Sequence, residues 1–167
     1  SDLFAWMYNG QVTVPLLIRS PAGGYRGYGP THSQCPEKHL LGIPGTRVVA
    51  LHRRCCPGRL YRELLRSLDR PTLVIENKLL YGQKPSAETP PGWQLLHSDQ
   101  AFPTARITPP GTADVTIVCY GGMVDQAEAA AQTLNRDEEL TAEILIPTSL
   151  YPLDLQPLAE SVVRTRR

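Results

Sequence analysis

The sequence lacks the features that would assign it to a membrane, to a secretory route or to nucleic acid. Its 167 residues contain no apolar run long enough to span a bilayer, and no charged-then-apolar signal opens the chain. The formal net charge is only +1 at pH 7, so no long-range field favours nucleic acid or an acidic membrane surface. We therefore expect neither nucleic acid nor a membrane among its partners.

Cysteine is scarce, and its spacing excludes the usual cysteine-based sites. The four cysteines, Cys35, Cys55, Cys56 and Cys119, show no metal-ligand spacing. Adjacent Cys55 and Cys56 are poor disulfide partners for each other on geometric grounds. Cys119 lies in an apolar strand pattern and is expected to be a small buried hydrophobe. These features predict a reduced, intracellular protein.

An apolar fraction of 41% is enough for a packed core in one domain or in two partial ones. Two basic clusters are present, Arg53-Arg54 and the tail with Arg164, Arg166 and Arg167. Both lack the interleaved aromatic residues of nucleic-acid platforms, so we interpret them as solvated surface or as the last turn of a helix. The chain opens without Met on an amphipathic stretch, and we expect both ends to be cuts through a larger protein.

Apolar runs and helix-length segments alternate along the first half of the chain. The runs at residues 12–18, 47–51 and 72–75 predict strands buried on both faces. Residues 58–68 have leucines at helical spacing, and a shorter helix with Ser33 as its N-cap is predicted over residues 33–41. This alternation predicts an α/β fold with a parallel sheet flanked by helices.

The second half begins with a proline-rich segment. Residues 83–111 show little periodicity, and we predict an extended linker with one short strand around Ala105-Arg106-Ile107. The expected organisation is therefore a first part at residues 1–82, the linker, and a second part at residues 112–167. In the second part the predicted strands are residues 114–120 and 141–146, and the predicted helices are residues 123–134 and 153–163.

A glycine-rich loop at residues 23–34 is the strongest candidate for a functional site. Its four glycines let the backbone approach a ligand closely, and His32 can titrate near neutral pH and move protons. Ligands in α/β sheets bind beyond the carboxyl ends of strands, where both this loop and the Gly121-Gly122 turn are predicted. A plain surface turn is the alternative interpretation. The other loop residues of the candidate site are Gly27, Tyr28, Gly29, Ser33 and Gln34.

Several short motifs follow one another along the chain, and their order is more informative than any single one. They are residues 10–16, Arg19-Ser20-Pro21 with the glycine-rich loop, His32-Ser33-Gln34, Ile43-Pro44-Gly45, and residues 76–82, 113–118, 120–124 and 152–154. In this order they resemble the β subunit of the thiamine-diphosphate-dependent 2-oxoacid dehydrogenases. That group includes the pyruvate, branched-chain 2-oxoacid and acetoin dehydrogenases and has a transketolase-like fold.

The resemblance implies a fold and a set of partners. Residues 1–82 would be the later part of a pyrimidine-binding domain, and residues 112–167 the first half of a transketolase C-terminal domain. Thiamine diphosphate with magnesium would be shared with an α subunit, and a second β subunit and a lipoyl-bearing acyltransferase would be further partners. The implied reaction is oxidative decarboxylation of a 2-oxoacid such as pyruvate, in the bacterial cytoplasm or the mitochondrial matrix.

The resemblance also implies roles for single residues. His32 matches the histidine that lines the family's active site and helps proton transfer or lipoyl engagement. Leu16 matches a position beside which the family commonly binds potassium, although the nearby loop, residues 68–71, is shorter here. The glutamate that activates the cofactor lies upstream of this region in the family, so the cofactor-binding residues stay unassigned. Residues 51–58 and Ile146-Pro147-Thr148 depart from the family pattern.

Two alternatives to this function remain open. The missing glutamate motivates the first, a truncated or degenerate β-type module that binds a partner and has no catalysis of its own. The second is another thiamine enzyme, such as a transketolase or a deoxyxylulose-phosphate synthase. The context His32-Ser33-Gln34 argues against this second alternative.

Overall fold

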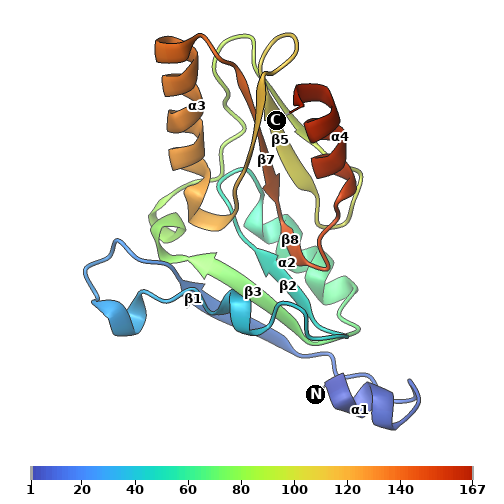
Figure 1. The fold of residues 1–167 in the computed structure, drawn as a ribbon. Helices are drawn as coiled ribbons and strands as arrows, with labels where there is room; N and C mark the ends of the chain where they lie inside the picture. The colour runs from blue at the N-terminus through green and yellow to red at the C-terminus, as the bar shows by residue number, and fades with distance from the viewer. Residues whose placement is uncertain (1, 167) are drawn as a thin grey trace.

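The computed structural model describes residues 2–166, and Figure 1 shows them as two sheets arranged one above the other with helices on their faces. The strand order is β1-β3-β2-β8 in the first sheet and β4-β5-β7-β6 in the second. A short helix, α1 (Asp2–Met7), stands away from the body at the N-terminal end. The predicted α/β class is confirmed. No helix within residues 2–166 combines the length and the apolar character that crossing a membrane requires.

The first sheet has a parallel part, formed by β1 (Leu17–Ala22), β3 (Thr72–Asn77) and β2 (Arg47–Ala50). Helix α2 (Pro57–Arg66) connects β2 to β3 and packs Leu60 and Leu64 into a core with Val49 and Val74. These elements confirm the predicted strands and helix. The predicted strand at residues 12–18 is wrong over most of its length, because β3 begins at Thr72 opposite Leu17 and offers earlier residues no ladder partner.

The predicted helix over residues 33–41 is absent, and two 3-10 turns take its place. These are η1 (Pro30–His32) and η2 (Pro36–His39). Pro36 forces the preceding Cys35 into an extended conformation, which separates the two turns. Ser33 does not cap a helix, and its hydroxyl instead donates to the Gly29 carbonyl at 2.7 Å.

The second sheet is mixed, which corrects the parallel arrangement expected from the sequence. Its strands are β4 (Gln94–His97), β5 (Thr104–Thr108), β7 (Ala142–Pro147) and β6 (Val115–Val118). Strand β5 contains the predicted strand at Ala105. However, β4 and β5 form an antiparallel hairpin that joins β7, so residues 83–111 are not an extended linker throughout. A hairpin connection this short can join only antiparallel strands.

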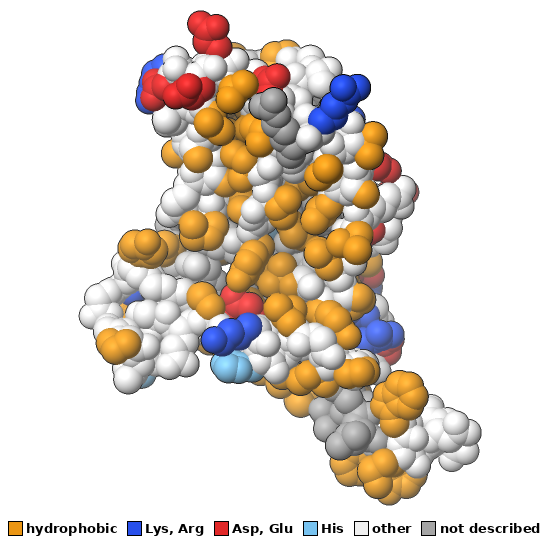
Figure 2. All heavy atoms as spheres, in the orientation of Figure 1, with side chains coloured by type: hydrophobic (Ala, Val, Ile, Leu, Met, Phe, Trp, Pro, Cys, Tyr) orange, Lys and Arg blue, Asp and Glu red, His pale blue; other side chains and the backbone are white. Residues whose placement is uncertain are grey.

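Two helices cover the second sheet. Helix α3 (Val124–Glu138) packs Val124, Ala127 and Ala131 against the inward side chains of β7. Helix α4 (Gln156–Thr165) lies on the opposite face, and just before it the Asp154 carboxylate accepts the Gln156 N–H at 3.0 Å. Figure 2 shows apolar side chains gathered on the surface between these helices, and Val118 on the edge strand β6 is half exposed.

The chain passes from the second sheet back to the first through β8 (Ser149–Tyr151). This strand is antiparallel to β2, and the Ala50 N–H donates to the Thr148 carbonyl at 2.9 Å. Strand β8 was not predicted, because a strand of three residues is too short to show a periodic pattern. The crossing places the ends of β6 and β3 close enough for their loops to touch.

Candidate functional site

Two loops from distant parts of the chain meet at the side chain of Asn77, the last residue of β3. Gly23 opens the glycine-rich loop, and Gly122 lies in the 3-10 turn η4 (Gly121–Met123) after β6. A Cβ on Gly23 would lie 2.4 Å from Asn77 Nδ2, and a Cβ on Gly122 would lie 2.4 Å from Asn77 Cγ. The two glycines therefore leave a slot that the Asn77 amide fills, and the two strand-end loops expected from the sequence form one surface.

Hydrogen bonds and backbone angles define the shape of the glycine-rich loop. The Gly23 N–H donates to the Gln34 carbonyl at 3.0 Å and closes the loop at its base. Gly27 and Gly29 have φ angles of 73° and 69°, a region that residues with a side chain rarely adopt. The Ser33 hydroxyl bond to Gly29 braces the far side. The loop is thus internally bonded, which a plain surface turn would not require.

His32 lies on η1 with an exposed side chain and lines an open hollow of about 660 Å³. The Lys78 ammonium donates to the His32 carbonyl and lies 5.9 Å from the centre of the Tyr28 ring. None of the side chains that line the hollow is acidic, so the hollow favours neutral or anionic groups. Three residues predicted for the site, Tyr28, His32 and Gln34, line the hollow. The remaining lining residues, which were not predicted for the site, are Pro21, Thr31, Pro36 and Lys78.

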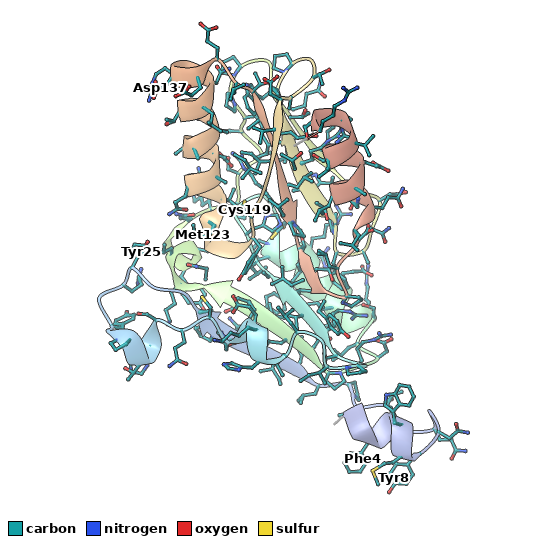
Figure 3. The ribbon with its side chains drawn as sticks, in the orientation of Figure 1. Phe4, Tyr8, Tyr25, Cys119, Met123 and Asp137 are labelled. Carbon is teal, nitrogen blue, oxygen red and sulfur yellow. The ribbon has the colours of Figure 1, made fainter. Side chains whose placement is uncertain are left out.

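A further contact joins η2 to the turn after β6. The Tyr120 hydroxyl donates to Glu37 Oε1 at 2.7 Å, and the Glu37 side chain is buried. Burial and this hydrogen bond raise the pKa of Tyr120 to about 12, so it stays a neutral donor. Figure 3 shows Tyr25 on the loop and Met123 on η4 at the side of the molecule where loop and turn meet, and both are exposed.

Sequence reasoning missed Asn77, Lys78, Glu37 and Tyr120 as site residues. A usable signal existed for the first two, because Asn77-Lys78 directly follows a predicted strand and therefore falls at its carboxyl end. No such signal marked Glu37, since it comes to the site only through η2.

Glu76, next to Asn77, is a structural group. It is 3% exposed, and its carboxylate accepts hydrogen bonds from Arg19 at 2.9 and 3.0 Å, from Tyr81 at 2.7 Å and from Tyr61. Burial works to raise the pKa of Glu76, but the bonds from Arg19 and the two tyrosines outweigh it and hold the pKa below its usual range. Glu76 is therefore ionised at neutral pH and does not act as a catalytic acid.

Leu16 lies at the opposite end of β1 from the glycine-rich loop. Its carbonyl accepts the Thr72 N–H at 2.7 Å beside residues 68–71, where the side chain of Asp69 is bound by Arg70. Among residues 2–166 no three His, Cys, Asp or Glu side chains cluster in a way that would hold a metal ion. The potassium site at Leu16 stays a prediction.

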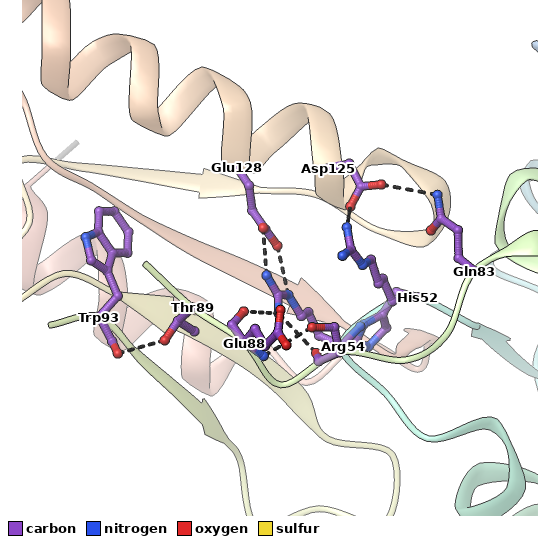
Figure 4. Close-up of polar contacts among 10 residues, drawn as sticks. His52, Arg54, Gln83, Glu88, Thr89, Trp93, Asp125 and Glu128 are labelled. Carbon is purple, nitrogen blue, oxygen red and sulfur yellow. Dashed lines mark hydrogen bonds and ion pairs between the residues drawn. The ribbon is translucent and has the colours of Figure 1, made fainter. Parts of the chain in front are cut away.

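Arg54 holds the two halves of the chain together, and the prediction that it is solvated is wrong. It is 6% exposed, and Nε and one terminal nitrogen donate to the Glu128 carboxylate on α3 at 2.8 and 2.7 Å (Figure 4). Its other terminal nitrogen donates to the carbonyls of Ser86 and Glu88. Its neighbour Arg53 pairs with Asp125 in a partly exposed position. The loop after β2 is thus clasped to α3.

His52 is buried beside this clasp. Its Nε2 lies 3.0 Å from Thr148 Oγ1, and its Nδ1 accepts the Arg54 N–H at 3.2 Å. The Thr148 hydroxyl donates to the Pro103 carbonyl, so His52 Nε2 is the donor in the first bond. Burial, with smaller contributions from His97 and Arg54, lowers the pKa of His52 to about 3.

We expect His52 to make the fold sensitive to acid. The unfolded imidazole binds a proton near its ordinary pKa of 6.5, whereas the folded one stays neutral down to about 3. The contribution is complete above pH 6.5 and is lost as pH falls toward 3, which amounts to about 2 kcal/mol between pH 7 and 5. Urea unfolding at both pH values should show this dependence weakened in His52→Gln and retained in His39→Gln, an exposed control. An unchanged dependence in His52→Gln would refute the assignment.

The sequence is similar to a known domain family and to several known proteins. Residues 104–167 match the family described as the transketolase C-terminal domain. Nearly the whole chain is similar to β subunits of three oxidoreductases. It is 35% identical to the pyruvate dehydrogenase E1 component subunit beta-2 of Oryza sativa subsp. japonica, over 97% of this chain and 42% of that protein.

The other two relatives are bacterial. The 2-oxoisovalerate dehydrogenase subunit beta of Pseudomonas aeruginosa is 32% identical over 95% of this chain and 47% of its own length. The acetoin:2,6-dichlorophenolindophenol oxidoreductase subunit beta of Cupriavidus necator is 36% identical over 98% of this chain and 46% of its own length. The chain thus spans less than half of the curated relatives that it matches here.

Solved transketolases share the fold. A split-gene transketolase, solved as an inactive β4 tetramer, has a TM-score of 0.58 at 21% identity, over 92% of this chain and 46% of that chain. The transketolase of Leishmania mexicana has a TM-score of 0.58 at 18% identity, over 90% of this chain and 21% of that chain. At this level of identity the likeness concerns the fold alone.

Proposed function

We propose that this chain, which is related over nearly all of its length to the β subunits of the 2-oxoacid dehydrogenases, supplies one wall of the active site of such an enzyme. Residues 1–82 would be the later part of a pyrimidine-binding domain, and residues 112–167 would belong to a transketolase C-terminal domain. The complete enzyme would pair α and β subunits, two of each. It would decarboxylate a 2-oxoacid such as pyruvate and transfer the acyl group to lipoyl.

The observation that carries the proposal is the meeting of the His32 loop and the Gly122 turn at Asn77. On the same loop, His32 exposes its imidazole to an open hollow, which lies at the carboxyl ends of parallel strands, where α/β sheets bind ligands. Acyl transfer to lipoyl opens a disulfide and leaves one sulfur that needs a proton. We assign that proton transfer to His32, because an imidazole can both accept and donate a proton.

The cofactor would be thiamine diphosphate with magnesium, and it would supply the nucleophilic carbon that makes decarboxylation possible. Residues 2–166 contain no cluster of side chains suited to a metal ion. We therefore assign the diphosphate and magnesium ligands to the α subunit. This chain would contribute the glycine-rich loop, which lets backbone approach closely, and the imidazole of His32.

Exposed apolar groups support the presence of partner chains. Tyr25 on the glycine-rich loop, Met123 on η4 and Val118 on the edge strand β6 are all at least half exposed. We assign these surfaces to contacts with the α subunit, a second β subunit and a lipoyl-bearing acyltransferase. The compartment would then be that of the complex, the bacterial cytoplasm or the mitochondrial matrix.

A β-type module that only binds its partner is the second candidate. The observation that favours it is the divergent segment around Arg54, where the buried guanidinium binds Glu128 and so serves the fold. Such a module would keep the fold and the exposed partner surfaces. It would bind an α subunit without contributing to turnover.

Assembly with the α subunit separates the two candidates. The purified complex should bind thiamine diphosphate and magnesium in calorimetry. It should also turn over pyruvate, 3-methyl-2-oxobutanoate or acetoin in an artificial-acceptor assay, and the acyl group should reach lipoyl when the acyltransferase is added. The α subunit alone is the control. A stable complex that neither binds the cofactor nor turns over any of these substrates would refute the enzyme and support the module.

A further inference from the structure

We infer that Lys78 is a positioning residue that clamps the glycine-rich loop and keeps His32 at the hollow. Only the catalytic consequence rests on the proposed function, since the clamp itself is a property of the fold. Lys78 begins the 3-10 turn η3 (Lys78–Gly82), directly after Asn77. The residue that joins the two loops is therefore followed at once by the residue that holds one of them.

The first contact of the clamp is to the backbone of His32. The Lys78 ammonium donates to the His32 carbonyl, across 46 residues of sequence. A bond to the main chain fixes the position of the residue while leaving its imidazole free. The side chain of His32 accordingly remains exposed on the hollow.

The second contact is to Tyr28, on the other side of the loop. The Lys78 ammonium lies 5.9 Å from the centre of the Tyr28 ring, within the range of a cation–π attraction. One cation thus reaches the loop at two points, Tyr28 and His32, with Gly29, Pro30 and Thr31 between them. Gly29 has a positive φ, so the backbone between the two contacts is at a position where glycine gives unusual freedom.

Lys78 forms no ion pair with an acidic side chain in the described part of the chain. The ion pairs within residues 2–166 do not include it, and no acidic side chain lines the hollow. A lysine that served only solubility would extend into solvent, whereas Lys78 is half-buried. Its ammonium therefore acts on the loop and not on a carboxylate.

Loss of the clamp should act on catalysis through the position of His32. A loop with four glycines samples many conformations when it is released, so the imidazole would spend less time where it can reach the reacting sulfur. The step that needs His32 would slow. Recognition of the 2-oxoacid would not change, because Lys78 binds the loop and not the substrate.

The activity test uses Lys78→Met and Lys78→Arg in the assembled enzyme. Lys78→Met should lower kcat for lipoyl acylation about tenfold, the scale of a lost acid–base contribution, with KM for the 2-oxoacid unchanged. Lys78→Arg should restore kcat to within about threefold, because a guanidinium both donates hydrogen bonds and stacks on aromatic rings. In a His32→Ala background, Lys78→Met should cause no further loss. A full further loss there would overturn the positioning role.

A second measurement tests whether Lys78 holds the loop, and it does not depend on enzyme turnover. Amide hydrogen exchange over residues 23–34 should become about tenfold faster in Lys78→Met and stay near wild type in Lys78→Arg, since local opening governs exchange. Strand β3 should not change in either variant, and Lys84→Met, at an exposed lysine, is the matched control. Unchanged exchange in Lys78→Met would overturn the inference. A wild-type complex without turnover would instead count against the proposed function. The exchange result would still show whether Lys78 holds the loop.

Discussion

Arg54→Met is expected to lower the free energy of unfolding by about 3–5 kcal/mol, the cost of breaking a buried ion pair by removing one partner. The substitution keeps the length of the side chain but leaves the Glu128 carboxylate without its two hydrogen bonds. The carbonyls of Ser86 and Glu88 lose their donor as well. Urea unfolding followed by circular dichroism measures the change.

Arg53 provides the matched control for this prediction. It also pairs with a carboxylate on α3, Asp125 at 2.8 Å, but both side chains are more than a third exposed. Arg53→Met should therefore cost no more than about 1 kcal/mol. Adding Glu128→Gln to Arg54→Met should recover part of the loss, because it removes the stranded charge. Equal losses for the two arginine variants would contradict the clasp.

The parallel half of the fold could be predicted because its strands are apolar and its helix is periodic. Residues 47–51, 58–68 and 72–75 all formed the expected elements within a few residues. The start of β1 could not be predicted, since the position of Thr72 on the neighbouring strand decides it. Of the hairpin, only β5 was predicted, because the surrounding prolines leave β4 without a periodic pattern. Strand β8 depends on a pairing with β2 that no local pattern reveals.

The candidate site was predicted in outline but not in its contacts. The rule that ligands bind at the carboxyl ends of strands located both loops. Their connection through Asn77 depends on the absence of two side chains, and a sequence shows the glycines without showing what fills the space. Arg54 was predicted to be solvent-exposed, because nothing in the sequence distinguishes it from its neighbour Arg53. Only the fold shows that one faces Glu128 and the other Asp125.

Gly122→Ala is expected to disrupt the meeting of the two loops. The new methyl group would lie 2.4 Å from the Asn77 side chain, closer than real contacts allow, so the amide or the turn must move. Gly122 is not among the positive-φ glycines, and the cost therefore comes from the clash with Asn77. We expect a loss of about 1–3 kcal/mol in stability, typical of overpacking, and a drop in turnover of the assembled enzyme.

A double variant shows whether Asn77 is the cause. Asn77→Ala opens the slot, so Gly122→Ala should cost less in that background than in the wild type. Gly82→Ala is the control, because its Cβ would meet no heavy atom within 4 Å and its φ is not positive. Additive costs at positions 77 and 122 would show that the slot is not what joins the loops.

We propose that the glycine-rich loop presents His32 as the proton-transferring group of an active site shared with the α subunit. His32→Ala in the complete complex tests it most directly, by lipoyl-dependent turnover alongside the artificial-acceptor assay. The His32 side chain is exposed, and the bond from Lys78 reaches the His32 carbonyl, so the substitution should leave the fold unchanged. His32→Ala should lower lipoyl-dependent turnover at least about tenfold. Turnover equal to that of the wild type would contradict it.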